Sequence, residues 1–183
     1  MTEPVEMTPA EWTLAPLPPG EEPLLRQMFQ FYLYDFSEME HNDIGENGVF
    51  LPDPEPYLSR FWSDPDKTAL LLRAGGRPVG FTLIEEHSPF PDSRDRRYVA
   101  AFFVMRAYRR RGLGAIMARE MFRRWPGRWQ VLEVRANPIA QRFWRGAIAD
   151  AVGGDYAERW LSERELVQEF SNAEGSKWRS EQN

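Results

Sequence analysis

Residues 102–114 read Phe-Phe-Val-Met-Arg-Ala-Tyr-Arg-Arg-Arg-Gly-Leu-Gly, an apolar run followed by a short basic segment and two glycines. The apolar run begins at Tyr98, and its length suits a buried strand. From Gly112 to Trp125 apolar residues recur with helical spacing, and Pro126-Gly127 ends that pattern. The stretch therefore predicts a buried strand, a basic turn and the start of a helix.

A junction of this kind favours binding of an anion. The first amides of a helix lack partners within the helix and carry partial positive charge. Gly112 and Gly114 would let the backbone approach phosphate oxygens closely, and Arg109–Arg111 add forked cationic donors. These residues predict a diphosphate cradle. Its spacing differs from Gly-x-Gly-x-x-Gly and from Gly-x-x-x-x-Gly-Lys-Ser/Thr, which argues against a nicotinamide cofactor and against nucleoside triphosphate hydrolysis.

The flanking sequence predicts further strands and helices on both sides. Before the junction we expect a strand at 11–17, an amphipathic helix from Pro23 to Met39, a loop at 42–56, a short helix at 56–62 and a hairpin of strands 68–74 and 79–85. After it we expect a strand at 129–134, a helix at 138–149 and strands at 155–160 and 164–170. This order predicts one α/β domain over residues 11–170, between a flexible segment at 1–10 and a polar tail at 171–183.

Composition excludes several classes of site. The 183 residues contain no cysteine, which rules out disulfides, thiolate zinc sites and iron–sulfur clusters, and two histidines argue against a histidine-rich metal site. We therefore expect no metal. The acidic, Pro-rich first twenty residues do not resemble a secretory signal, and the longest apolar run, Val99–Met105, is too short to span a membrane. These features predict a cytoplasmic protein without a membrane partner.

Charge is distributed unevenly along the chain. The net charge is −5, yet residues 94–145 hold fourteen arginines against Asp95, Glu120 and Glu133. Many of these arginines could simply be solvated on helix faces, and an Arg-rich block also raises the alternative of a nucleic-acid-binding protein. Because the rest of the chain is acidic and would repel a phosphate polymer, we expect a small polyanionic ligand and no nucleic acid.

A second motif follows the strand predicted at 129–134. It reads Asn137-Pro-Ile-Ala140-Gln-Arg-Phe143-Trp144. Together with Arg109-x-x-Gly112-x-Gly114, it makes the chain resemble the GNAT superfamily of acetyl-CoA-dependent N-acetyltransferases. That family carries Gln/Arg-x-x-Gly-x-Gly/Ala and then Asn-x-x-Ala-x-x-Leu/Phe-aromatic in this order. The resemblance implies a mixed, mostly antiparallel central sheet of about six or seven strands flanked by about four helices.

The resemblance also implies roles for individual residues toward acetyl-CoA. The backbone of Phe103, Val104 and Met105 would pair with the pantetheine arm. Backbone amides from Arg109 to Gly114 would hold the pyrophosphate, with arginine side chains reaching the phosphates or the adenosine end; this set is Arg109, Arg110, Arg111, Gly112, Leu113 and Gly114. Asn137 would fix the turn beside the pantetheine. Phe143 would line the channel near the thiol beside Trp144, although both aromatics could equally be core residues.

The reaction implied is direct attack of an amine on the thioester. A lysine-like acceptor is protonated at neutral pH and must lose a proton first. Glu86, Glu85 and Asp35 are candidate bases, and Tyr34 and Tyr156 are candidate proton donors. The chain departs from the family in two ways: Trp144 replaces a common tyrosine acid, and the strand from Tyr98 to Met105 carries no acidic residue.

The acceptor and the assembly stay open. An acidic stretch in the first third suggests a cationic acceptor by electrostatic attraction, or merely a solvated loop; its residues are Asp35, Glu38, Glu40, Asp43 and Glu46. A non-catalytic acyl-CoA-binding sensor of the same fold is the alternative function, which the missing tyrosine favours. The family also makes a homodimer a reasonable expectation.

Overall fold

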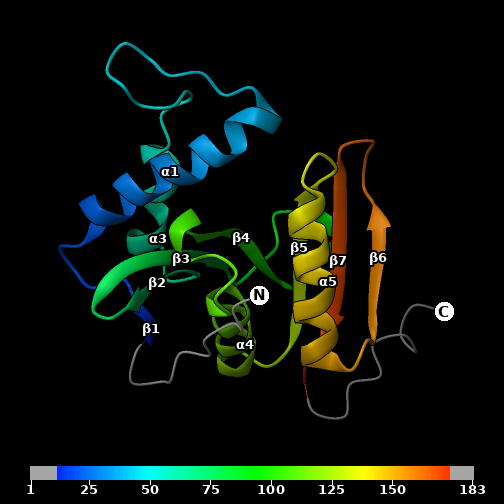
Figure 1. Ribbon diagram of the computed structural model, residues 1–183. Coiled ribbons are helices and arrows are strands. Elements are labelled where there is room, and N and C mark those ends of the chain that lie inside the picture. Colours follow the sequence, from blue (N-terminus) through cyan, green and yellow to red (C-terminus); the bar gives the residue numbers. More distant parts are fainter. Residues whose placement is uncertain (1–11, 174–183) are drawn as a thin grey trace, which may run out of the picture. The chain divides into compact units, whose positions relative to one another are not determined.

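The computed structural model describes residues 12–173 and contains seven strands and five α-helices within them (Figure 1). The elements are β1 (Trp12–Pro16), α1 (Glu22–Glu40), α2 (Glu55–Leu58), α3 (Arg60–Ser63), β2 (Lys67–Ala74), β3 (Arg77–Glu85), β4 (Arg97–Val104), α4 (Leu113–Arg124), β5 (Arg128–Val134), α5 (Pro138–Val152), β6 (Tyr156–Trp160) and β7 (Glu165–Ser171). The predicted order is confirmed. The short helix expected at 56–62 consists of two single turns, α2 and α3.

The ends of the chain differ in part from expectation. Residues 1–10 and 174–183 lie outside the described residues. The tail predicted from 171 begins later, because Ser171 ends β7 and Asn172 is held by its backbone amide, which donates to the Gly127 carbonyl at 3.1 Å, and by two side-chain hydrogen bonds. Its side-chain oxygen accepts from the Gly127 amide at 2.9 Å, and its amide nitrogen donates to the Phe122 carbonyl at 2.7 Å.

The strands form one mixed sheet in the order β1-β2-β3-β4-β5-β7-β6. The pairs β1/β2, β5/β7 and β6/β7 are antiparallel. Strands β4 and β5 are parallel, in register from Arg97↔Trp129 to Val99↔Val131, and β4 continues to Val104. The expected mixed, mostly antiparallel sheet flanked by helices is therefore present.

The chain divides into two compact units. Unit 1 holds the described residues up to Leu83 together with Ala101–Gly114, and unit 2 holds Ile84–Ala100 with the described residues from Ala115 onward. Strands β3 and β4 and helix α4 each contribute residues to both units.

In unit 1, α1 covers β3 and β4 through an aromatic cluster. The ring centroid of Phe81 lies 5.9 Å from that of Phe29 and 6.1 Å from that of Tyr32. Phe103 of β4 joins the cluster, 5.5 Å from Phe81 and 6.5 Å from Tyr32. The 3–4 residue spacing of apolar residues along α1 places these rings on one face, and their burial fixes the helix on the sheet.

A close approach of β3 to β4 holds the end of β4 in place. The Met105 amide donates to the Val79 carbonyl at 2.8 Å. A Cβ atom at Gly80 would lie 2.5 Å from the Phe103 carbonyl oxygen. Only glycine fits at this position, and Gly80 therefore helps to determine where β4 ends and the basic turn begins.

In unit 2, α5 lies along β5, β6 and β7 (Figure 1). Phe122 of α4 is at the centre of its core, with ring centroids 4.9 Å from Phe170, 5.2 Å from Trp129 and 6.3 Å from Trp144. Trp129 and Phe170 have no exposed surface. These large rings account for much of the apolar area that stabilises unit 2.

Strand β4 is fully buried on one face only. Val99, Ala101 and Phe103 are buried, whereas Ala100 and Phe102 are half-buried. A continuous apolar run is typical of a strand buried on both faces, whereas the second face of β4 is half-buried at Ala100 and Phe102.

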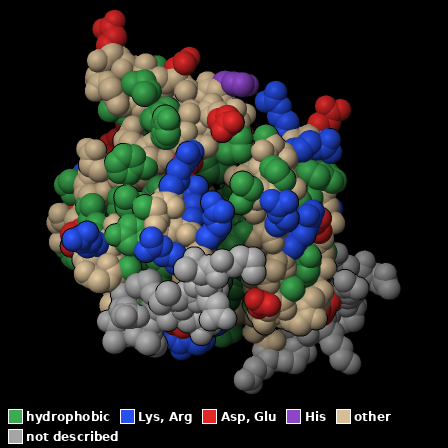
Figure 2. All heavy atoms as spheres, in the orientation of Figure 1, with side chains coloured by type: hydrophobic (Ala, Val, Ile, Leu, Met, Phe, Trp, Pro, Cys, Tyr) green, Lys and Arg blue, Asp and Glu red, His purple; other side chains and the backbone are tan. Residues whose placement is uncertain are grey.

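Positive and negative side chains are intermixed with apolar ones on the face drawn in Figure 2. Among the described residues no helix is long and apolar enough to cross a membrane.

Candidate functional site

The basic turn after β4 has an unusual backbone. A short 3₁₀ turn (Arg106–Tyr108) begins it, and the Tyr108 amide donates to the Met105 carbonyl at 2.8 Å. Arg110 then has φ = 58° and Gly112 has φ = 79°, both in the left-handed region. Left-handed residues in a turn can direct neighbouring amides toward one side, as in the concave anion-binding sites of other proteins.

Within residues 12–173, no side chain accepts a hydrogen bond from the amides of residues 110–114. Helix α4 begins at Leu113, so these amides also lie at the positive end of a helix. Leu113 itself is fully buried and can offer only its backbone. This arrangement is compatible with the diphosphate cradle that the sequence predicts.

Arg109 uses its side chain within unit 1. Its Nε donates to the Val104 carbonyl at 2.7 Å, its guanidinium lies 5.7 Å from the centre of the Phe103 ring, and it pairs with Asp35 of α1. Arg106 pairs with the other oxygen of Asp35 at 2.7 Å. Both guanidinium groups are thus directed to α1, whereas the sequence had suggested that the Arg109 side chain reaches phosphate.

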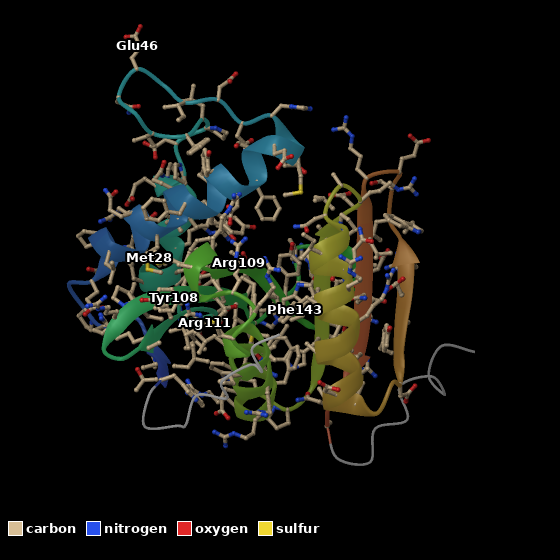
Figure 3. The ribbon with its side chains drawn as sticks, in the orientation of Figure 1. Met28, Glu46, Tyr108, Arg109, Arg111 and Phe143 are labelled. Carbon is tan, nitrogen blue, oxygen red and sulfur yellow. The ribbon has the colours of Figure 1, made fainter. Side chains whose placement is uncertain are left out.

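Arg110 and Arg111 remain for contacts with an anion. Both side chains are exposed, and the guanidinium of Arg111 lies 5.6 Å from the centre of the Tyr108 ring. Figure 3 shows Tyr108, Arg109 and Arg111 together at this turn.

The second motif lies in unit 2 and caps α5. The Asn137 side chain accepts from the Ala140 amide at 3.0 Å, which satisfies one of the free amides at the helix start. Gln141 donates to the carbonyls of Val134 and Arg135 at 3.0 and 3.2 Å. Asn137 therefore fixes the turn after β5, as the resemblance implies.

The two aromatics of this motif have different environments. Trp144 is 5% exposed and contacts Phe122, which makes it part of the unit 2 core. Phe143 is half-buried, with its ring 5.0 Å from that of Trp144. Only Phe143 keeps surface that a ligand could contact.

The predicted bases lie in three different settings. Glu86 forms a bidentate ion pair with Arg97, at 2.7 and 2.8 Å. Asp35 pairs with two arginines and is 14% exposed. A carboxylate in either position must give up charge-assisted hydrogen bonds before it can accept a proton. Glu85 is buried. Burial of Tyr98 is the main cause that raises the pKa of its phenol to about 12, and the negative charge of Glu85 is the second cause.

Sequence reasoning did not single out Glu133, a buried carboxyl group with a strongly raised pKa. Glu133 of β5 is 4% exposed, and neither of its oxygens has a hydrogen-bond partner in the described part of the chain. Burial, followed by the charge of Glu158, raises its pKa to about 8, and Arg145 opposes that rise. The signal in the sequence was a single acidic residue inside an otherwise apolar strand.

Polar neighbours from β6, β7 and α5 surround Glu133. On β7, Gln168 is fully buried and donates to Glu158 at 2.7 Å, while its own side-chain oxygen has no partner among the described residues. Glu158 in turn forms a bidentate pair with Arg145, at 2.8 Å for both bonds. Buried polar groups without partners are rare and are found at functional sites.

Comparison with known proteins identifies the family. The family model described as "Acetyltransferase (GNAT) family" matches residues 27–147, which include both motifs. The chain belongs to the GNAT acetyltransferase family. No curated protein matches its sequence.

Solved structures of acetyltransferases share the fold. An acetyltransferase from Thermus thermophilus is 22% identical with a TM-score of 0.63, over 88% of this chain and 97% of that one. PaiA N-acetyltransferase from Thermoplasma acidophilum, solved in complex with coenzyme A, is 11% identical with a TM-score of 0.60, over 90% and 99%. YncA from Salmonella typhimurium, solved with its cofactor acetyl-CoA, is 12% identical with a TM-score of 0.58, over 91% and 96%.

Proposed function

We propose that this GNAT protein transfers the acetyl group of acetyl-CoA to a primary amine by direct attack in a ternary complex. Family membership and the open amides of residues 110–114 support acetyl-CoA as co-substrate. Family membership supports an amine as the acceptor, and Glu133 is the residue that we propose as its base. An ammonium acceptor must lose a proton before it attacks, and Glu133 is a buried carboxyl whose pKa of about 8 matches that task.

The amine nitrogen attacks the thioester carbonyl carbon, a C–N bond forms, and the C–S bond breaks to release the thiolate of coenzyme A. Glu133 would take the first proton from the ammonium before attack, directly or through water, and the second N–H proton, lost as the C–N bond forms, would pass to solvent or to the released thiolate. A thiol pKa of about 8.5 lets the thiolate leave near neutral pH without a strong acid, so Trp144 in place of tyrosine is compatible with turnover.

Roles for the other residues follow from their positions. The amides of residues 110–114 would bind the diphosphate, with Arg110 and Arg111 at its edge. The Val104 carbonyl already accepts from Arg109, and the Met105 amide already donates to Val79. The pantetheine arm would therefore pair with the other backbone amides and carbonyls of Phe103–Met105. Asn137 would hold the turn after β5, and Phe143 would contact the arm near the thiol.

Substitution Glu133→Gln tests the base. We expect kcat to fall about 100-fold or more, as is usual for loss of a general base. The Glu133→Gln variant should also have a larger free energy of unfolding than the original protein, because an ionised Glu133 destabilises the folded state. The folded pKa of about 8 lies above the ordinary 4.5, so the native state loses stability as pH rises from about 4.5 to 8. The gain from Glu133→Gln should therefore grow over that range.

Steady-state rates and thermal unfolding at pH 5, 7 and 9 provide both readouts. Glu120→Gln is the matched control, since Glu120 pairs with Arg123 on the surface of α4 in the same unit. If Glu133→Gln keeps its kcat, the base lies elsewhere.

The alternative, an acyl-CoA-binding sensor, is favoured by the burial of Trp144 among core aromatics, since tryptophan cannot supply a proton. Incubation with acetyl-CoA and a panel of amines separates the two functions. An enzyme releases free thiol in step with acetylated amine, detected by mass spectrometry. A sensor binds acetyl-CoA and releases none.

A further inference from the structure

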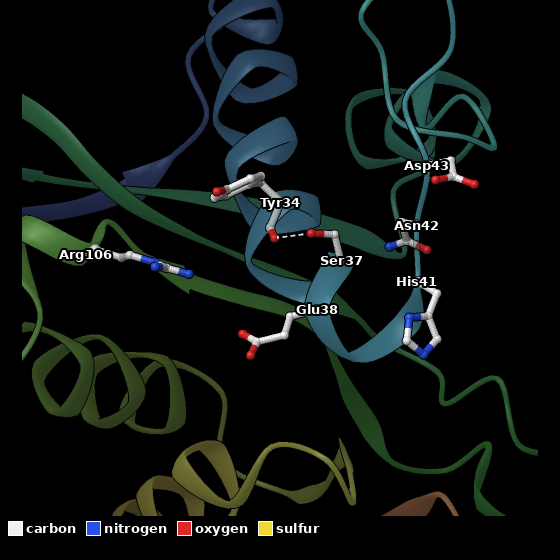
Figure 4. Close-up of a pocket in the computed structure, with 7 residues that line it drawn as sticks. All are labelled: Tyr34, Ser37, Glu38, His41, Asn42, Asp43 and Arg106. Carbon is white, nitrogen blue, oxygen red and sulfur yellow. Dashed lines mark hydrogen bonds between the residues drawn. The ribbon is translucent and has the colours of Figure 1, made fainter.

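Acidic side chains of this protein lie in two contrasting settings. Glu38 and Asp43 line a pocket at the C-terminal end of α1, where both are exposed and point away from one another (Figure 4). Water solvates both charges there. Glu133 in unit 2 is 4% exposed, so bulk water cannot solvate its two oxygens. The protonation state of this buried carboxyl group therefore depends on the side chains around it.

Gln168 of β7 is a diagonal neighbour of Glu133 across the sheet. In the antiparallel pair β5/β7, Glu133 is opposite Leu166, and Val131 is opposite Gln168. Because side chains alternate along a strand, these four residues share one face of the sheet. Long side chains can bridge a diagonal pair of this kind, so Glu133 and Gln168 lie within reach of one another.

The charges of β6 and α5 determine the orientation of the Gln168 amide. Its Nε2 donates to Glu158 at 2.7 Å. Glu158 is held as an anion by its bidentate pair with Arg145, which lowers the pKa of Glu158. A carboxylate accepts hydrogen bonds and cannot donate them, so the NH₂ group of Gln168 must face Glu158. The Gln168 oxygen is left for another donor, and it has no partner among the described residues.

Three buried acceptor oxygens on two adjacent strands thus lack a donor within the described part of the chain: both oxygens of Glu133 and the Oε1 of Gln168. Two acceptors cannot form a hydrogen bond unless one of them carries a proton. A proton on Glu133 makes it a donor, and an O–H bond to Gln168 would satisfy an oxygen of each residue. An ionised Glu133 would instead bury an unpaired charge beside an unsatisfied amide oxygen, which is the more costly state.

Charged groups on the neighbouring elements act on Glu133 in opposite directions. Burial has the largest effect and raises its pKa to about 8, Glu158 of β6 adds to the rise, and Arg145 of α5 opposes it. From β7, Gln168 contributes no charge. The pKa of Arg145 is itself raised, chiefly by its hydrogen bond to Glu158 and to a smaller extent by Tyr156. Two further charged side chains of α5 are exposed, Arg142 and Asp150.

We propose that Gln168 is a positioning residue for Glu133, which accepts the O–H of the protonated acid and so holds Glu133 neutral in the resting protein. The proposal rests on the proposed function, in which Glu133 is the base. To act as that base, Glu133 first releases its proton to water and the bond to Gln168 breaks. When Glu133 takes a proton from the ammonium, the bond to Gln168 forms again.

Titration of the Glu133 carboxyl carbon by ¹³C NMR, without acetyl-CoA, tests the proposal, with Glu133→Gln to assign the signal. In the original protein we expect a neutral carboxyl group at pH 6 and a midpoint well above the ordinary 4.5. Gln168→Met keeps the length of the side chain and removes the acceptor. A hydrogen bond to the neutral form raises the pKa of a carboxyl group, so the midpoint should fall by about one unit in this variant.

Gln130→Met is the matched control. Gln130 is also fully buried and also donates to a buried glutamate, Glu169 at 2.8 Å, but alternation along β5 places it on the opposite face from Glu133. This variant should lose stability and keep the Glu133 midpoint. A midpoint near 4.5 in the original protein, an unchanged midpoint in Gln168→Met, or an equal shift in Gln130→Met overturns the proposal.

Infrared spectroscopy gives a readout that does not require Gln168→Met to fold. The carbonyl band of protonated Glu133 is identified by its loss in Glu133→Gln. A frequency typical of a hydrogen-bonded acid supports the bond to Gln168, and the frequency of a free acid contradicts it.

The pH dependence of kcat separates this inference from the proposed function. If Glu133 is the base, the acidic limb of the profile should move in Gln168→Met by the same amount and in the same direction as the NMR midpoint. An NMR shift without a change in the profile would place the base elsewhere and still support the role of Gln168. The NMR titration also stays measurable if no amine is acetylated.

Discussion

Two strand-to-helix junctions of this protein differ in whether a described side chain accepts a hydrogen bond from the amides at the helix start. After β5, the Asn137 side chain accepts from the Ala140 amide and Gln141 braces the preceding carbonyls, so the helix start is satisfied from within. After β4, the turn carries left-handed residues at Arg110 and Gly112, and no described side chain accepts from the amides of 110–114. A helix start that is capped supports structure, and one that is left open and basic can bind an anion.

We call the junction after β4 the open junction and the junction after β5 the capped junction. The largest expected effect comes from placing a negative charge at the open junction. Gly112 has φ = 79°, where any side chain is strained, and a Cβ atom added there would have no described atom within 4 Å. In Gly112→Asp, kcat/KM for acetyl-CoA should fall at least about 100-fold, because like charges brought together cost several kcal/mol. Initial rates at low acetyl-CoA measure this. A loss of less than about threefold would contradict the proposal that the open junction binds the diphosphate.

A smaller effect is expected from Asp35, which holds the arginines of the open junction from α1. We expect Asp35→Asn and Arg109→Ala each to weaken acetyl-CoA binding about tenfold by loosening the turn, and the double variant to lose little more, because the two residues act through one interaction. Titration calorimetry of the four proteins measures the coupling. Fully additive losses would show that Arg109 and Asp35 act separately.

The smallest effect is expected at the capped junction. Asn137→Ala should lower the free energy of unfolding by about 1 kcal/mol through loss of the cap, and should change the Kd of acetyl-CoA less than about threefold. Urea unfolding and titration calorimetry measure the two quantities. A tenfold weaker Kd would instead place Asn137 in direct contact with the cofactor.

Local signals in the sequence predicted most of the fold and the open junction. The apolar spacing of α1, the Gly75-Gly76 hairpin and the Asn-Pro start of α5 each act within a few residues, so the sequence alone reveals them. The arginines at 109–111 and Gly112 marked the anion-binding turn for the same reason.

The remaining features depend on contacts between distant residues. Asp35 lies 74 positions from Arg109 in the chain, and only the packing of α1 on β3 and β4 brings them together. The sequence pattern made Asp35 a candidate base, whereas the structure gives it two arginine partners. From the sequence alone, Glu133 counted only as a charge. Its lack of a hydrogen-bond partner among the described residues depends on burial among β5, β6, β7 and α5. Such burial is not visible in local periodicity.

Thermal unfolding with and without acetyl-CoA tests the central claim most directly, with Arg109→Ala/Gly112→Asp as the control. Acetyl-CoA at about 100 times its Kd should stabilise the protein by ~2.7 kcal/mol. For a domain of this size that corresponds to a rise in Tm of roughly 5–10 °C, lost in the double variant. No rise at millimolar acetyl-CoA, or an equal rise in the variant, would contradict the assignment of the open junction as the acetyl-CoA site.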